Sequence, residues 1–258
     1  MLRIAVCAVL SLAVSFGQSP ATQSEGPRFE VVSIKPAQGG AVGLFSYPGG
    51  RIVANAMTLE LLMIEAFDVQ EFQLSGGPGW MRTDRYQIEA KPPASSALVN
   101  ARPSPPDRPN EEQRQMLQAL LADRFQLKIH REAKDGSVYL LTKSGKALKL
   151  QAPKNIDEAP WAGGLGGGNI SGDGLAGKNI SMAQLAKRLS WFMGRPVIDQ
   201  TGIEGSFDFL YDQVSDDPHP DVAAWIITSV QALGLRLEAS KGPVETIVID
   251  HAEKPSSN

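Results

Sequence analysis

The chain has 258 residues, of which 25 are basic, 28 are acidic and 42% are hydrophobic. This nearly balanced charge argues against a nucleic-acid-binding protein, whose affinity depends on clustered Lys and Arg. The hydrophobic fraction is that of a folded globular protein, and Cys7, the only cysteine, excludes an intrachain disulfide and a site with several cysteine ligands.

The N-terminus has the three parts of a cleavable signal peptide. Arg3 supplies a positive charge, residues 4–14 are apolar apart from Ser11, and small residues precede Gln18. The apolar run is too short to span the hydrocarbon core of a membrane, which takes about 20 residues. We therefore expect a signal peptide at residues 1–17, cleavage near Gly17-Gln18, and a periplasmic or secreted mature chain without a transmembrane segment.

A flexible lead-in is expected at residues 18–28, which are small and polar, and a first α+β unit at residues 29–151. Alternation predicts a strand at Phe29–Ile34. Thr58 and Asn110 are candidate N-caps of two helices, because their side chains can accept an otherwise unpaired backbone N–H. The strands Phe125–Ile129 and Val138–Leu141 are expected to form a hairpin, and the turn signal between them lies at residues 134–136.

A glycine-rich linker is predicted at residues 152–173, and a second unit at residues 174–258. Ser181 is the candidate N-cap of the first helix of this unit, and Asp221 starts its second helix. A second hairpin is expected, with its turn at residues 241–243. The order strand, helix, strand, strand, helix, strand, strand recurs in both units. We therefore predict an α+β fold of two pattern-repeated units, each a small, mostly antiparallel sheet with two helices packed on one face.

Several segments carry a resemblance to a known family. They are Thr58–Phe67, Gln73–Trp80, Leu120–Phe125, Gly194–Gly202 and Val248–His251. In this order they resemble the signature blocks of a soil-associated acidobacterial secreted protein family, which is a domain of unknown function. The resemblance implies export and architecture but no chemistry. Some relatives join this domain to an antibiotic-sensor-type membrane metallopeptidase, which implies a sensory or envelope role.

A second resemblance lies at the level of fold. The strand–helix pattern is similar to the short N-terminal domains of secretins and TonB-dependent receptors. Because unrelated functions share such folds, this likeness implies no activity.

Candidate cofactor and metal sites are weak. Residues 172–179 nearly match a phosphate-binding loop, but Asn179 stands where that motif needs Ser or Thr to hold Mg²⁺. The histidines His130, His219 and His251 lack the paired spacing of metal ligands. We predict no cofactor and no metal site.

Candidate catalytic residues are equally few. The carboxylates Asp199, Asp208 and Asp212 lie near one another along a predicted strand pair, and paired carboxylates can hydrolyse glycosides. A solvent-exposed strand face is the preferred interpretation. No nucleophile elbow and no cysteine nucleophile is present in the mature sequence. We therefore predict no catalytic residue.

The most distinctive segment runs from Gly76 to Trp80. Its glycines and proline favour a tight turn, whose Trp80 either covers the edge of the core or offers an aromatic platform to a sugar or peptide. Arg195 occupies the similar place in the second unit, where Asp199 could pair with it or cap the turn. Trp80, Arg195 and Asp199 are the candidate ligand-binding residues.

These observations favour a non-catalytic binding or interaction module of the cell envelope. Its partner would be an envelope protein, a peptide or a glycan, bound at sheet edges or in a cleft between the units. The alternatives are a secreted hydrolase whose site only the fold assembles, and a sensory domain acting with a separate membrane protein. A histidine, His130 or His251, within hydrogen-bonding reach of two carboxylates in a deep pocket would favour the hydrolase.

Overall fold

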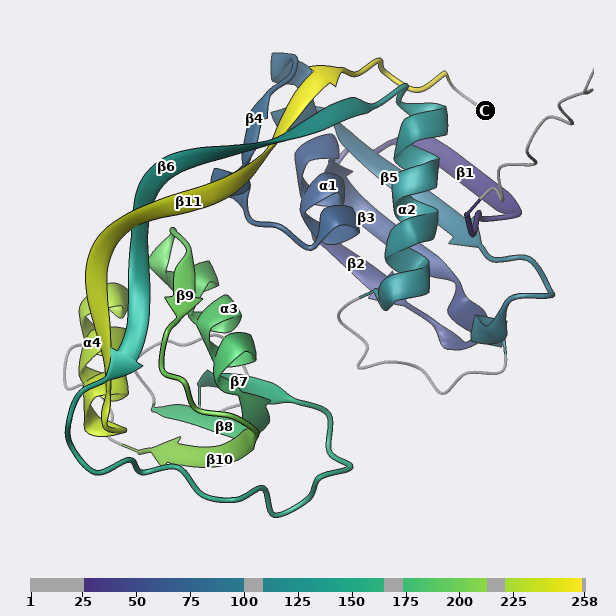
Figure 1. Ribbon diagram of the computed structural model, residues 1–258. Coiled ribbons are helices and arrows are strands. Elements are labelled where there is room, and N and C mark those ends of the chain that lie inside the picture. The colour runs from purple at the N-terminus through teal and green to yellow at the C-terminus, as the bar shows by residue number, and fades with distance from the viewer. Residues whose placement is uncertain (1–25, 100–108, 165–173, 213–220, 257–258) are drawn as a thin grey trace, which may run out of the picture.

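The computed structural model describes residues 26–99, 109–164, 174–212 and 221–256. The predicted signal peptide, its cleavage site and His219 lie outside the described residues. In the part described, the fold is α+β, as the sequence predicts (Figure 1). The helices are α1 (Leu59–Phe67), α2 (Glu111–Arg124), α3 (Met182–Met193) and α4 (Val222–Ala232). The strands are β1 (Val31–Pro36), β2 (Gly43–Ser46), β3 (Ile52–Thr58), β4 (Leu74–Gly76), β5 (Arg85–Lys91), β6 (Lys128–Lys143), β7 (Trp161–Gly164), β8 (Leu175–Ser181), β9 (Val197–Asp199), β10 (Ser206–Tyr211) and β11 (Leu235–His251).

Each helix begins at the residue that the sequence predicts. Thr58 Oγ1 accepts a hydrogen bond from the Leu61 N–H at 3.2 Å, and Asp221 accepts from two N–H groups of α4. Asn110 and Ser181 form capping boxes at the starts of α2 and α3. These side chains take N–H groups that the helix itself leaves unpaired, so the helix starts are locally encoded.

The first lobe is the sheet β1-β5-β3-β2 together with α1 and α2 (Figure 1). Its core contains Ile34 and Ile88 from the sheet, Leu62 from α1 and Leu117 from α2. Phe125, which follows α2, is fully buried there. Apolar residues on one face of the sheet and one stripe of each helix therefore share a single core.

The second lobe is the sheet β10-β8-β7 together with α3 and α4. Leu175, Leu185 and Ile226 are fully buried in its core, which is separate from that of the first lobe. Part of the predicted linker belongs to this lobe, because residues 161–164 form β7 and pair with β8. The linker prediction is wrong for these residues.

A long ribbon of β6 and β11 joins the lobes and curves between them (Figure 1). The strands pair antiparallel from Lys128 opposite His251 to Lys143 opposite Leu235. β4 adds in parallel to one end of β11 and β9 adds in parallel to one end of β6, so the central sheet has the order β4-β11-β6-β9.

The two predicted hairpins are wrong. The residues expected to turn instead lie in mid-strand, where Gly136 opposes Gly242. A Cβ on Gly136 would lie 2.8 Å from Val244 Cγ2, so this glycine permits close packing across the ribbon and makes no turn. Each strand therefore continues past the turn signal and finds its partner in the other half of the chain.

This pairing mixes the predicted units. Ile247 and Ile249 of β11 are buried in the first core, and Leu141 of β6 is buried in the second. Each core is thus completed by a strand from the other half, and the ribbon holds the lobes on either side of a hollow.

Candidate functional site

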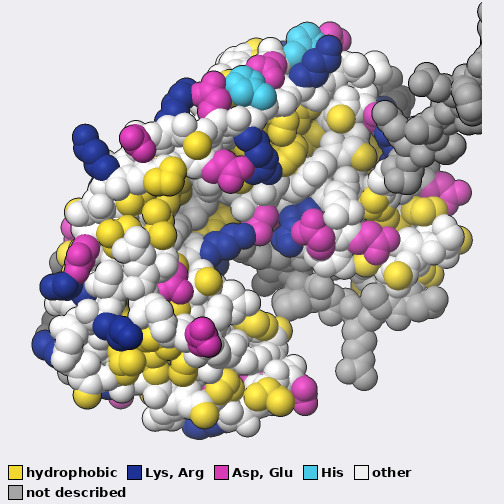
Figure 2. Space-filling model, in the orientation of Figure 1, with side chains coloured by type: hydrophobic (Ala, Val, Ile, Leu, Met, Phe, Trp, Pro, Cys, Tyr) yellow, Lys and Arg dark blue, Asp and Glu magenta, His cyan; other side chains and the backbone are white. Residues whose placement is uncertain are grey.

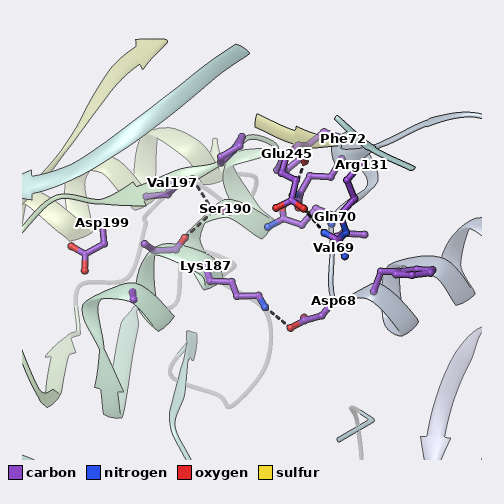
Figure 3. A pocket seen from close by; sticks show the side chains of 15 residues that line it. Asp68, Val69, Gln70, Phe72, Arg131, Lys187, Ser190, Val197, Asp199 and Glu245 are labelled. Atoms are coloured by element: carbon purple, nitrogen blue, oxygen red, sulfur yellow. Dashed lines mark hydrogen bonds and ion pairs between the residues drawn. The ribbon is translucent and has the colours of Figure 1, made fainter. Parts of the chain in front are cut away.

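The candidate site is the interlobe cleft, a hollow of about 390 Å³ beneath the ribbon. It is lined by the end of α1 and the turn after it, by α3, by β9, and by one face of the ribbon. Figure 2 shows the surface hollowed between the lobes, and Figure 3 shows the lining side chains. Its charged residues are Asp68, Arg131, Lys187, Asp199 and Glu245.

Asp68 connects the lobes across the cleft. It caps the C-terminus of α1 in a left-handed conformation with a φ of 51°. Its carboxylate pairs with Lys187 of α3 (Figure 3). Arg114 of α2 lies 3.8 Å from the same oxygen. The Asp68–Lys187 ion pair is therefore a direct polar link between the first lobe and the second.

A second ion pair lies on the ribbon above the cleft. Arg131 of β6 pairs with Glu245 of β11 (Figure 3). The backbone carbonyl of Glu245 also accepts a hydrogen bond of 3.1 Å from the Gln73 side-chain amide, beside β4. The cleft thus presents charges of both signs, and four of its five charged side chains are paired with one another.

Ser190 is the buried hydroxyl of the cleft. Its Oγ donates to the Ala186 carbonyl at 2.9 Å and accepts from the Val197 N–H at 2.8 Å. The first bond lies within α3, and the second ties α3 to β9. Both partners of the Ser190 hydroxyl are backbone groups, and no histidine is among the described residues that line the cleft.

Two of the three candidate ligand-binding residues lie near one end of the ribbon. Asp199 lines the cleft and caps a turn, accepting hydrogen bonds from the Thr201 N–H at 2.9 Å and the Thr201 hydroxyl at 2.8 Å. Arg195 instead places its guanidinium 5.0 Å from the centre of the Tyr139 ring. Of the two predicted roles for Asp199, the structure has the turn cap.

Arg195 lines a different hollow from Asp199. This second hollow of about 380 Å³ also contains Lys134 and Val244 of the ribbon. Phe72 and Pro196 line both hollows. The two spaces therefore adjoin without sharing Arg195 or Asp199.

Trp80 lines neither of these two hollows. It is half-buried against the first core, in the short helical turn Gly79–Arg82, and Lys254 Nζ lies 5.8 Å from the centre of its ring. Lys254 also pairs with Asp84 at 2.6 Å. Trp80 is therefore not brought together with Arg195 and Asp199.

Asp208, one of the carboxylates predicted near Asp199, bonds to backbone groups. Asp208 accepts backbone N–H bonds from Asn179 at 2.9 Å and Lys154 at 3.0 Å, and these bonds lower the pKa of its carboxyl. They favour the ionised carboxylate and hold Asn179 at a positive φ of 45°. Asp212 is exposed. The role of Asp208 is structural.

A histidine that contacts two carboxylates in a deep pocket would favour a hydrolase, and His130 meets the first of these two conditions. Its Nδ1 lies 2.8 Å from Asp250 and its Nε2 lies 3.0 Å from Glu132. These two hydrogen bonds raise the pKa of His130, that with Asp250 most. The side chain is 47% exposed on the ribbon surface and lines neither hollow. Two carboxylates are present, but the deep pocket is not.

In the described residues, no group of three or more His, Cys, Asp or Glu side chains could hold a metal ion. His251 lies 2.9 Å from Glu253. Of the near phosphate-loop motif, Lys178 and Asn179 lie in strand β8, and Lys178 pairs with Glu158 at 3.2 Å.

Sequence reasoning missed the residues that charge the cleft. Asp68 and Lys187 are 119 positions apart, and Arg131 and Glu245 are 114 apart. No local spacing connects such residues. The one available signal was the position of Asp68 directly after an apolar helix pattern, which marks a helix end but not its partner.

A family model described as "Protein of unknown function (DUF3738)" matches residues 60–252, and the chain belongs to this family. No curated protein and no solved structure matches the chain. The resemblance to a domain of unknown function is thereby confirmed. The acidobacterial origin and the likeness to secretin and TonB-dependent receptor domains stay predictions. Within the described ranges, no helix is long and apolar enough to cross a membrane.

Proposed function

We propose that this member of the DUF3738 family is an exported, non-catalytic binding module of the cell envelope, with its ligand bound in the interlobe cleft. One observation carries the proposal: charged side chains from both lobes and the ribbon meet in the cleft, where they pair with one another. Asp68 with Lys187, and Arg131 with Glu245, are the two pairs. A preformed polar hollow of this kind can recognise a ligand without reacting with it.

The charges favour a particular ligand chemistry. Lys187 and Arg131 can bind a carboxylate, and Asp68, Asp199 and Glu245 can bind an ammonium group. A short peptide presents both groups and can displace each internal ion pair with a matching charge. A neutral glycan presents neither, so a peptide is the better-supported ligand.

The hydrolase alternative has less support. Ser190 is bonded to backbone groups on both sides, Asp208 holds a bulged strand, and His130 lies outside the cleft. Hydrolysis needs a nucleophile or activated water beside a base. The described residues of the cleft offer no such arrangement.

A sensory domain acting with a separate membrane protein is the second candidate. The Asp68–Lys187 ion pair connects the two lobes. A ligand that replaces this pair changes the contact between the lobes, so it binds one arrangement of the lobes better than another. Such differential affinity is what a ligand needs to shift a conformational equilibrium.

The proposal includes two pattern-repeated units. The order strand, helix, strand, strand, helix, strand is followed once from β3 to β6 and again from β8 to β11. The short strands β4 and β9 each add in parallel to the long strand of the other half. These correspondences support an internal repeat in which the halves exchange their last strands.

The binding proposal is tested with the mature chain, from Gln18, and a panel of short peptides with free termini, by calorimetry. Lys187→Gln is expected to weaken binding about ten-fold, because one charge-assisted contact is lost. Lys178→Gln is the matched control, since Lys178 is similarly exposed and ion-paired but lies outside the cleft. Equal effects of both variants, no binding, or cleavage of a peptide would overturn the proposal.

Export is tested separately. The full chain is expressed in a diderm bacterium, and the N-terminus of the protein in each cell fraction is sequenced. Export predicts a periplasmic or extracellular protein that begins near Gln18. An intact N-terminus in the cytoplasmic fraction would contradict it.

A further inference from the structure

One edge of the ribbon is open. β9 pairs with β6 only at residues Tyr139, Leu140 and Leu141, and no other described strand lies on that edge. The span from Ile129 to Ser137 is mostly exposed. A row of unpaired N–H and C=O groups on such an edge is a template for another strand.

The odd-numbered residues of β6 direct their backbone groups to this edge. Tyr139 N–H donates to the Pro196 carbonyl at 2.8 Å, and the Leu141 carbonyl accepts from the Gln200 N–H at 2.9 Å, both toward β9. Even-numbered positions bond across the ribbon, as Ser144 N–H does to the Gly234 carbonyl at 3.0 Å. The register of β6 runs unbroken from residue 129 to residue 143, so the alternation holds throughout.

The opposite edge of the ribbon is closed along the stretch of β11 that pairs with the open span of β6, from Pro243 to Ile249. Odd positions of β11 face outward there, and one of them is Pro243, which has no N–H to donate. The next outward carbonyl, that of Glu245, accepts the Gln73 amide, and β4 covers the residues beyond. Over this stretch the ribbon is thus protected on the β11 side and unprotected on the β6 side.

We propose that the open edge of β6 pairs antiparallel with the same edge of a second copy of the chain, around a two-fold axis at Ala133. In this register Arg131 lies opposite Asp135 of the second copy, and Glu132 lies opposite Lys134. Each opposed pair joins unlike charges, and the two-fold axis repeats both pairs. The edge is therefore complementary to itself.

Neighbouring registers fail on two grounds. A shift of one residue sets outward backbone groups against inward ones, so the ladder cannot form. A shift of two sets Glu132 opposite Glu132, or Lys134 opposite Lys134, and like charges directly opposite are destabilising. Ala133 is also the midpoint of the open span, which β9 limits at one end and the start of β6 limits at the other.

The interface is small. Nine residues from each copy give about ten main-chain hydrogen bonds. Interfaces of this size belong to weak associations, so the dimer forms in a concentration-dependent manner. The charges that select this register also exclude unrelated strands, which is how an exposed edge avoids general aggregation.

The test is sedimentation equilibrium of the mature chain over a range of concentrations. Wild type is expected to show a monomer–dimer equilibrium. Glu132→Lys sets like charges opposite each other at two places, as does Lys134→Glu, so each variant is expected to raise the dimer dissociation constant about ten-fold or more. A circular-dichroism melt of each variant establishes that the monomer is folded.

The decisive sample mixes the two single variants. In a heterodimer the two lysines of E132K face the two glutamates of K134E, so mixing is expected to restore dimers at a concentration where each variant alone is mostly monomeric. An effect confined to the monomer cannot be restored by mixing. The proposal is overturned if wild type stays monomeric at every soluble concentration, if dimers survive both single changes, or if the mixture dimerises no better than its components.

Discussion

The lobes and the ribbon between them are built on different principles. Each lobe buries a core of apolar side chains under capped helices, and the contacts that define it are largely within one half of the chain. The middle of the ribbon is exposed on one face and partly exposed on the other, and it carries the ion pair of Arg131 with Glu245, which are 114 residues apart. The buried cores of the lobes therefore stabilise the fold. The ribbon sets how the two lobes are placed relative to each other, and it also carries the surfaces that are available for binding.

The largest change in the free energy of unfolding is expected for a substitution in the core of a lobe. Phe125→Ala removes a fully buried ring that lies edge-on to Tyr86 with ring centres 5.3 Å apart. It is expected to lower the free energy of unfolding by about 3–5 kcal/mol. Lys241→Ala, at an exposed ribbon position, is expected to change it by about 0.5 kcal/mol or less. Urea denaturation measures both, and comparable losses would erase the distinction between lobe and ribbon.

Of the two opposed glycines of the ribbon, Gly136 is the one that is tightly packed. Gly136→Ala brings a Cβ within 2.8 Å of Val244 Cγ2, so it is expected to cost about 1–2 kcal/mol. The opposed Gly242→Ala meets nothing closer than 3.4 Å and is expected to be within about 0.5 kcal/mol of wild type. Adding Val244→Ala to Gly136→Ala should recover most of the loss. Equal costs at the two glycines, measured by urea denaturation, would contradict the ribbon packing.

The helix caps test whether the helix starts of both lobes are determined by residues close to them in the sequence. Asn110→Ala and Ser181→Ala each remove a capping box and are each expected to cost about 1 kcal/mol. Gln115→Ala, on the exposed side of α2, serves as the control and should change stability by less than about 0.5 kcal/mol. Thermal unfolding measures all three, and a cap variant indistinguishable from Gln115→Ala would show that its helix start is set by tertiary contacts.

The smallest effect concerns the outer surface of the ribbon. Hydrogen bonds with Asp250 and Glu132 raise the pKa of His130, so its contribution to stability is full below the unfolded-state pKa of about 6.5. The contribution is lost as pH rises through the raised folded-state pKa. The stability difference between wild type and His130→Gln should shrink over that interval. Urea midpoints at several pH values measure it, and a difference that grows with pH would contradict the assignment.

The sequence predicts the lobes well because their signals are local. The side chains of Thr58, Asn110, Ser181 and Asp221 each bond backbone within a few residues, so their patterns identify the helix starts. The ribbon could not be predicted in the same way. Asp135-Gly136 and Gly242-Pro243 are ordinary turn signals, and only the presence of the other strand makes continued pairing more favourable than a turn.

The residues of the candidate site also divide into those that a local sequence pattern predicts and those that it does not. Asp199 was found because it sits beside a turn, and it does cap that turn. The ion pairs of Asp68 and Arg131 depend on the placement of whole elements, so they carry no local pattern. A cleft made between two lobes is therefore visible only once the ribbon is in place.

The cross-lobe pairing of β6 with β11 is the central claim, and a disulfide tests it most directly. Cleavage of the predicted signal peptide removes Cys7, so the mature chain has no competing thiol. Ser137 and Lys241 are exposed and directly opposed, at a non-hydrogen-bonded position where Cα atoms lie about 4.5 Å apart. The ribbon predicts that the double variant Ser137→Cys, Lys241→Cys oxidises within one chain, giving a linked peptide pair by mass spectrometry. It predicts no intrachain disulfide in Ala133→Cys, Ser137→Cys, the pair that a local hairpin would join. The reverse result would show that each strand folds back on itself.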